Sequence, residues 1–154
     1  MSRPPVGVAL GLDAGSVRIG LAATDPTATI AGPVATLSGR DRAALWARVR
    51  EEAATRGAER LVVGLPKRLD GTEGDAAVRA RAFADEASRQ TGLPVEMWDE
   101  RLSTVAAERA LIEGGMRRAR RRETIDAVAA AIMLQNWLDS RRWRGAAPSG
   151  AGGR

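Results

Sequence analysis

The chain of 154 residues suffices for one domain with a hydrophobic core, and no apolar run suits an export signal or a bilayer span, so we expect a cytoplasmic protein without membrane contacts. It has neither cysteine nor histidine, which excludes disulfides and leaves acid–base chemistry to carboxylates or metal-bound water. The net charge of +5 comes from residues 117–154, where nine arginines accompany three acids, and this favours a partner that carries phosphate groups.

The first predicted element is a hairpin whose first strand ends in a carboxylate. Apolar side chains alternate with Ala9, Gly11 and Asp13 over residues 8–13, and the alternation resumes over 17–21 after a turn. Aspartate is uncommon in strands, and Asp13 follows a run typical of a central strand, so it is a candidate functional residue. An Asp that only opens the turn is the alternative, and this stretch alone does not decide between the two.

Strands and helices then alternate. In chain order we predict a strand over 29–37, a helix over 41–56, a buried strand over 61–65 and a polar loop over 66–74. A helix from Asp75 to Gly92, which carries Val78, Ala82 and Phe83, and a strand over 94–98 follow. The remaining elements are a helix that Ser103 or Thr104 caps and Gly114 ends, an exposed arginine-rich loop, and a last helix from about Thr124.

This order predicts an α/β fold with one five-stranded mixed sheet. The first three strands form an antiparallel meander, and the right-handed crossover rule allows the fourth and fifth to lie parallel to the first, with helices on both faces. We assign residues 1–140 to this single domain, and residues 141–154 to a basic tail that we expect to be disordered. The ends of the first and fifth strands then meet at one edge of the sheet.

Three acids can converge at that edge. Asp13 ends the first strand, Glu100 follows the fifth, and Asp126 heads an otherwise apolar face of the last helix. Neighbouring carboxylates repel by roughly 4 kcal/mol per pair at an effective dielectric constant near 20, so such a cluster must be protonated or bind a cation. Oxygen ligands select Mg²⁺ or Mn²⁺, and two such ions can promote phosphodiester hydrolysis. Spacing alone does not choose between Glu100 and its neighbour Asp99.

Four segments resemble motifs of the YqgF/RuvX family, whose members are related to the RuvC Holliday-junction resolvases and share the RNase H-like fold. They occur in the same order as in that family, at residues 12–20, at 63–66 with 70–72, at 99–104 and at 126–135. The resemblance implies catalytic acids at Asp13, Glu100 and Asp126, and it favours Glu100 over Asp99. It further implies a cytoplasmic, metal-dependent nuclease that trims the 5′ end of precursor 16S ribosomal RNA or resolves branched DNA.

Basic side chains near the acids are candidate nucleic-acid contacts. Arg18 and Arg101 can either hold phosphate oxygens or pair with the acids beside them, and Lys67 and Arg68 lie on the polar loop. The arginine-rich run is a further candidate, although such a run can simply solvate a surface; it comprises Arg117, Arg118, Arg120, Arg121 and Arg122. Among the tryptophans, we assign Trp46, Trp98 and Trp137 to the core and Trp143 to base stacking.

The leading hypothesis is therefore an endonuclease acting on structured RNA or branched DNA. An inactive nucleic-acid-binding module of the same fold is the first alternative. A sugar-kinase or actin-type ATPase is the second, but those proteins need two such domains to enclose a nucleotide. The oligomeric state stays open, because paired cuts at a junction favour a two-fold homodimer whereas end trimming does not require one.

Overall fold

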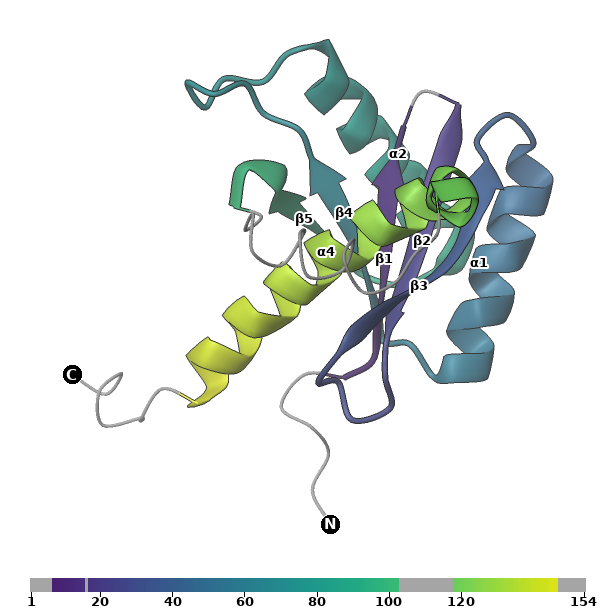
Figure 1. The fold of residues 1–154 in the computed structure, drawn as a ribbon, viewed down its shortest axis with the longest axis vertical. Helices are drawn as coiled ribbons and strands as arrows, with labels where there is room; N and C mark the ends of the chain where they lie inside the picture. Colours follow the sequence, from purple (N-terminus) through teal and green to yellow (C-terminus); the bar gives the residue numbers. More distant parts are fainter. Residues whose placement is uncertain (1–6, 16, 103–117, 147–154) are drawn as a thin grey trace.

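The structure is a computed structural model that describes residues 7–15, 17–102 and 118–146, with the side chains of α4 described from 125 to 141 (Figure 1). Its sheet has the order β3-β2-β1-β4-β5. The strands are β1 (Ala9–Ala14), β2 (Arg18–Thr24), β3 (Ala31–Ser38), β4 (Arg60–Leu65) and β5 (Val95–Asp99). The helices are α1 (Arg42–Arg56), α2 (Asp75–Thr91), the 3₁₀ turn η1 (Glu100–Leu102) and α4 (Arg118–Ala146).

The strand directions confirm the predicted fold. β1 pairs antiparallel with β2, with Asp13 opposite Gly20, and β2 pairs antiparallel with β3. β4 runs parallel to β1, and β5 runs parallel to β4. The carboxyl ends of β1, β4 and β5 therefore lie at one edge of the sheet, which is the part of an open α/β sheet where ligands usually bind.

Helices cover both faces of this sheet. Leu10, Leu12 and their neighbours pack against α1 and α2, while Ala9 and Val62 on the opposite face pack against α4. Figure 1 shows α4 crossing the front of the sheet with α1 and α2 behind it. None of the described helices combines the length and apolar character that crossing a bilayer requires.

The last helix is longer than we predicted at both ends. α4 begins at Arg118, so the expectation of an exposed loop is wrong for positions 118–122, whose backbone is helical. Arginine is a good helix former, and no glycine or proline interrupts this run, so its charge does not make it a loop. α4 also continues to Ala146 and thus includes the first residues of the segment that we expected to be a disordered tail. The predicted helix over 103–114 and Arg117 lie outside the described residues.

Two other predictions need refinement. Val78 is 63% exposed and Ala82 is also exposed, and the buried face of α2 consists instead of Phe83 and four alanines, Ala77, Ala80, Ala84 and Ala87. The sequence favours Asp75 as the N-cap of α2, but Gly74 occupies that position and Asp75 is the first helical residue. Trp46 and Trp137 are buried as predicted, whereas Trp98, which we also assigned to the core, is only half-buried. The side chain of Trp143 is not among those that the structure describes.

Candidate active site

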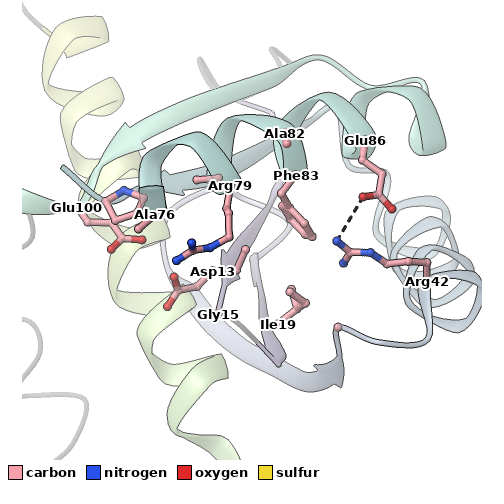
Figure 2. A pocket seen from close by; sticks show the side chains of 14 residues that line it. Asp13, Gly15, Ile19, Arg42, Ala76, Arg79, Ala82, Phe83, Glu86 and Glu100 are labelled. Carbon is pink, nitrogen blue, oxygen red and sulfur yellow. Dashed lines mark ion pairs between the residues drawn. The ribbon is translucent and has the colours of Figure 1, made fainter. Parts of the chain in front are cut away.

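Asp13 and Glu100 are placed by the ends of two strands. Asp13 is the fifth residue of β1, where its backbone is held by the pairing with Gly20. β5 ends at Asp99, and Glu100 begins η1, so the chain changes direction between the two acids. Figure 2 shows the carboxyl groups of Asp13 and Glu100 at the same end of one cavity.

Asp99 has a different environment from Glu100. Its carboxylate accepts hydrogen bonds from the Arg101 side chain, the shortest at 2.7 Å from a terminal guanidinium nitrogen, and from the Arg101 backbone N–H at 3.0 Å. The Arg101 guanidinium lowers the pKa of Asp99, which therefore stays ionised and engaged. The two adjacent acids therefore have different partners: Asp99 pairs with Arg101, whereas Glu100 lines the cavity with Asp13.

The side chains of Asp13 and Glu100 share a hydrogen bond. Burial, the negative charge of Asp13 and this hydrogen bond raise the pKa of Glu100 to about 7. Burial is also the main cause that raises the pKa of Asp13, with a further contribution from the charge of Asp126, while the hydrogen bond from Glu100 acts in the opposite sense. The hydrogen bond thus lowers one pKa and raises the other, which places the shared proton on Glu100.

Asp126 lies beside this pair, on α4. Its Oδ2 atom accepts a hydrogen bond from Nε of Arg18 at 2.8 Å, an ion pair that joins the start of β2 to α4. Asp126 is close enough for its charge to raise the pKa of Asp13. Within the described part of the chain, however, no three acidic side chains form a ready-made metal cluster. The structure thus joins two of the predicted acids directly and sets the third alongside them with an arginine partner.

Two glycines leave the space in which Asp126 and Glu100 lie close to the sheet. A Cβ atom on Gly20 would collide with the backbone carbonyl of Asp126, so the absence of a side chain lets α4 lie directly on β2. A Cβ atom on Gly64 would collide with the carboxyl group of Glu100. The sequence analysis did not assign a role to either glycine. A glycine inside a buried strand often marks a close approach of another group, which is the signal that could have identified both.

The predicted basic contacts differ in what they bind. Arg18 pairs with Asp126, and Arg101 pairs with Asp99 and also donates to the carbonyl of Leu69 at 3.4 Å. Arg68 lies 3.5 Å from the hydroxyl of Thr72 within its own loop, and half-buried Lys67 helps to lower the pKa of Asp99. Arg117 and the side chains of Arg118, Arg120, Arg121 and Arg122 lie outside the description.

A cavity of about 620 Å³ extends from the two acids along α2. Its charged lining residues are Asp13, Glu100, Arg79, Arg42 and Glu86 (Figure 2). At the far end Arg42 pairs with Glu86 at 3.4 Å and lies over the ring of Phe83. This volume falls within the range of small-ligand sites.

Comparisons with known proteins agree with this architecture. Residues 7–140 match the model of the family described as "RuvX: Holliday junction resolvase". A protein of Cereibacter sphaeroides named "Putative pre-16S rRNA nuclease" is 48% identical over 92% of this chain and 89% of its own length. A protein of the same name from Symbiobacterium thermophilum is 46% identical over 87% of this chain and 93% of its own length.

The fold is also similar to a solved structure. Thermus thermophilus RuvC in complex with a Holliday junction substrate superimposes with a TM-score of 0.56 and 20% sequence identity, covering 89% of this chain and 96% of that one. At this identity the likeness concerns the fold, which is the RNase H-like arrangement predicted above. The family match, by contrast, spans nearly the whole described domain, and the chain therefore belongs to the RuvX family.

Proposed function

We propose that this protein is a metal-dependent endonuclease that hydrolyses phosphodiester bonds in structured nucleic acid, with Asp13, Glu100 and Asp126 as its catalytic acids. The observation that carries the proposal is the hydrogen-bonded pair Asp13–Glu100 at the carboxyl edge of the sheet, with Asp126 beside it. The chain offers neither histidine nor cysteine for the reaction. Its acids are consistent with a nuclease that relies on carboxylates.

Precursor 16S rRNA is the first candidate substrate, and branched DNA is the second. The relatives named for pre-16S rRNA share 46–48% identity with this chain, whereas RuvC shares 20%. Cleavage of precursor 16S rRNA, the activity in those names, therefore has the stronger support from sequence. A nucleic-acid partner of either kind also suits the positive charge of the C-terminal part.

The residues at the site fit a hard divalent cation. Their donor atoms are carboxylate oxygens, the ligands that hard divalent cations prefer. Burial raises the pKa of both Asp13 and Glu100, and the negative charge of a neighbouring acid adds to the increase: Asp126 for Asp13, and Asp13 for Glu100. Mg²⁺ or Mn²⁺ would be held by Asp13 and Glu100. Asp126 would be a further ligand if its carboxylate left the ion pair with Arg18. Such an ion, when bound, supplies Lewis acidity and lowers the pKa of a coordinated water.

The protein side chains prepare this site in three ways. The pairing of β1 with β2 fixes the backbone of Asp13, and Gly64 leaves room for the carboxyl group of Glu100. Without a cation, Glu100 is protonated below about pH 7 and donates a hydrogen bond to Asp13, which limits the repulsion between them. Arg18 forms an ion pair with Asp126 and so links the N-terminal half of α4 to β2. These contacts preorganise oxygen ligands that come from three separate segments.

A direct cleavage assay tests the proposal. The purified chain is incubated with an RNA that spans the 5′ end of precursor 16S rRNA and, separately, with a four-way DNA junction, in Mg²⁺, Mn²⁺ or EDTA. We expect metal-dependent cleavage, which Asp13→Asn lowers by about a thousandfold or more, because a metal ion contributes several kcal/mol to the transition state. Asp85→Asn is the matched control, since exposed Asp85 lies on α2 away from the acids.

Two results would contradict the proposal. If Asp13→Asn cleaves at the wild-type rate, the assignment of the catalytic acid is wrong. If the wild-type protein binds both nucleic acids but cleaves neither in any metal, the chain is a binding module rather than an enzyme.

A further inference from the structure

Among the side chains that line the cavity beside the acids is one arginine, Arg79, to which no role has been assigned above. Arg79 lies on α2, and its exposed side chain extends toward Asp13 (Figure 2). The sequence analysis did not select it, because its position in a helix does not distinguish it from the other surface arginines. Ala76 and Phe83, three residues before and four after it, line the same cavity, so this side of α2 faces the site.

The packing of α2 fixes where Arg79 projects. Four alanines and Phe83 form the buried face of the helix, and short side chains let the helix lie close to the sheet. Arg81, in the N-terminal half of α2, forms an ion pair with Glu73, with two hydrogen bonds of 2.7 and 2.6 Å, and so attaches the helix to the preceding loop. The base of the Arg79 side chain is thus held by rigid structure while its guanidinium group remains accessible.

The other charges that line the cavity already have partners. Arg42 pairs with Glu86, and Asp13 shares a hydrogen bond with Glu100. Beside the cavity, Arg18 pairs with Asp126 and Arg101 with Asp99. Arg79, in contrast, makes no hydrogen bond or ion pair with any of the residues 7–15, 17–102 or 125–141. Among the cationic side chains that the structure describes at the cavity, Arg79 is therefore the one available to an incoming anion.

We propose that Arg79 binds a phosphate group of the substrate strand adjacent to the cut, and so positions that strand across Asp13 and Glu100; this inference rests on the proposed nuclease function. A guanidinium group can donate two parallel hydrogen bonds to phosphate oxygens. A substrate phosphate that approaches three acids also needs a nearby cation to offset repulsion. The cavity that runs from the acids past Arg79 toward Arg42 supplies the path for the strand.

Binding measurements with defined probes test this assignment without relying on turnover. The probes are a fluorescent four-way DNA junction and a fluorescent RNA hairpin with a single-stranded 5′ extension, bound in Ca²⁺ under conditions in which a gel shows no cleavage. Arg79→Ala should weaken binding about tenfold and reduce the slope of log K against log salt by about 1, because one phosphate contact is lost. Arg79→Lys keeps the positive charge but not the two parallel donors, so it should lose less affinity than Arg79→Ala.

Arg89→Ala is the matched control. Arg89 lies in the last turn of the same helix and outside the cavity, so this variant removes the same charge from α2. It should retain wild-type affinity within about twofold, since a surface charge far from the contact adds little at moderate salt.

A scan with neutral methylphosphonate linkages identifies the phosphate that Arg79 contacts. Each phosphate of the bound strand is neutralised in turn, and the loss of affinity is compared between variants as a double-mutant cycle. One position next to the cleavage site should weaken binding to the wild-type protein and to Arg89→Ala but have no further effect on Arg79→Ala.

The outcomes separate the two proposals. If wild type cleaves a probe and Arg79→Ala keeps the wild-type set of sensitive phosphates, the nuclease function stands and the role of Arg79 is refuted. If wild type cleaves neither probe but the cycle shows coupling at one phosphate, the contact exists and the proposed nuclease function fails. If wild type binds neither probe, both proposals are wrong.

Discussion

At the scale of single residues, the position of Glu100 depends on a glycine. The carboxyl group of Glu100 occupies the space that a Cβ atom on Gly64 would fill, and the sulfur of Met133 lies 3.0 Å from the same point. We expect Gly64→Ala to displace the Glu100 carboxyl and lower the cleavage rate about a hundredfold, as a misplacement of about 1 Å in an active site can. Because the Glu100 side chain can move, the free energy of unfolding should change by no more than about 1 kcal/mol.

A matched alanine substitution checks this expectation. Gly32 lies on β3 in a position where a Cβ atom would meet no atom within 4 Å, so Gly32→Ala should retain the wild-type cleavage rate. Cleavage of the precursor RNA and urea-induced unfolding are measured for both variants. A Gly64→Ala protein with full activity would show that the observed position of Glu100 does not matter for the reaction.

At the scale of elements, the sequence predicts strands better than the last helix. The alternation from Val8 to Asp13 and the apolar run 61–65 determine β1 and β4 because strand side chains alternate strictly between two faces. The start of α4 was missed because an arginine run is compatible with an exposed loop and with a helix. Its C-terminal part was missed because Arg141 was assigned to the tail, whereas it binds Glu96 at 2.7 Å and lies over Trp137.

The candidate site, too, could be predicted from the sequence only in part. Asp13 could be selected from the sequence because it ends a predicted central strand, whereas Glu100 was chosen over Asp99 only through the resemblance to the YqgF/RuvX family. Pairing of Arg18 with an acid was one of two alternatives, but the sequence could not identify Asp126 as the partner, because the two residues are 108 positions apart and their contact depends on where α4 crosses β2. Arg79 could not be selected either, since only the packing of α2 shows which of its arginines faces the cavity.

The crossing of α4 over β2 gives a prediction at this scale. A Cβ atom on Gly20 would collide with the backbone carbonyl of Asp126 and would lie 3.0 Å from the backbone nitrogen of Ala127. Backbone atoms cannot rotate away as a side chain can, so Gly20→Ala must shift α4. We expect a loss of about 2–3 kcal/mol in the free energy of unfolding, measured in urea, together with reduced cleavage. Wild-type stability in this variant would mean that α4 does not lie against β2 as described.

At the scale of the whole molecule, the site connects segments that are distant in the chain, so a bound cation should stabilise the entire fold. The candidate ligands come from the end of β1, the start of η1 and the N-terminal half of α4. An unfolded chain cannot hold them together, and a ligand that binds only the folded state stabilises it by about 2.7 kcal/mol at a hundred times its dissociation constant. For a chain of this size, that stabilisation corresponds to a rise in Tm of about 5–10 °C.

We therefore expect MnCl₂ to raise the Tm of the wild-type protein in a thermal-unfolding experiment, and EDTA to reverse the increase. Asp13→Asn should unfold without metal at a temperature no lower than wild type, since it removes one of the mutually repelling charges, but MnCl₂ should no longer raise its Tm. Asp85→Asn removes the same charge from an exposed position and should keep the full increase. An equal increase in Asp13→Asn and wild type would place the cation elsewhere, and the acids at the sheet edge would then not be its ligands.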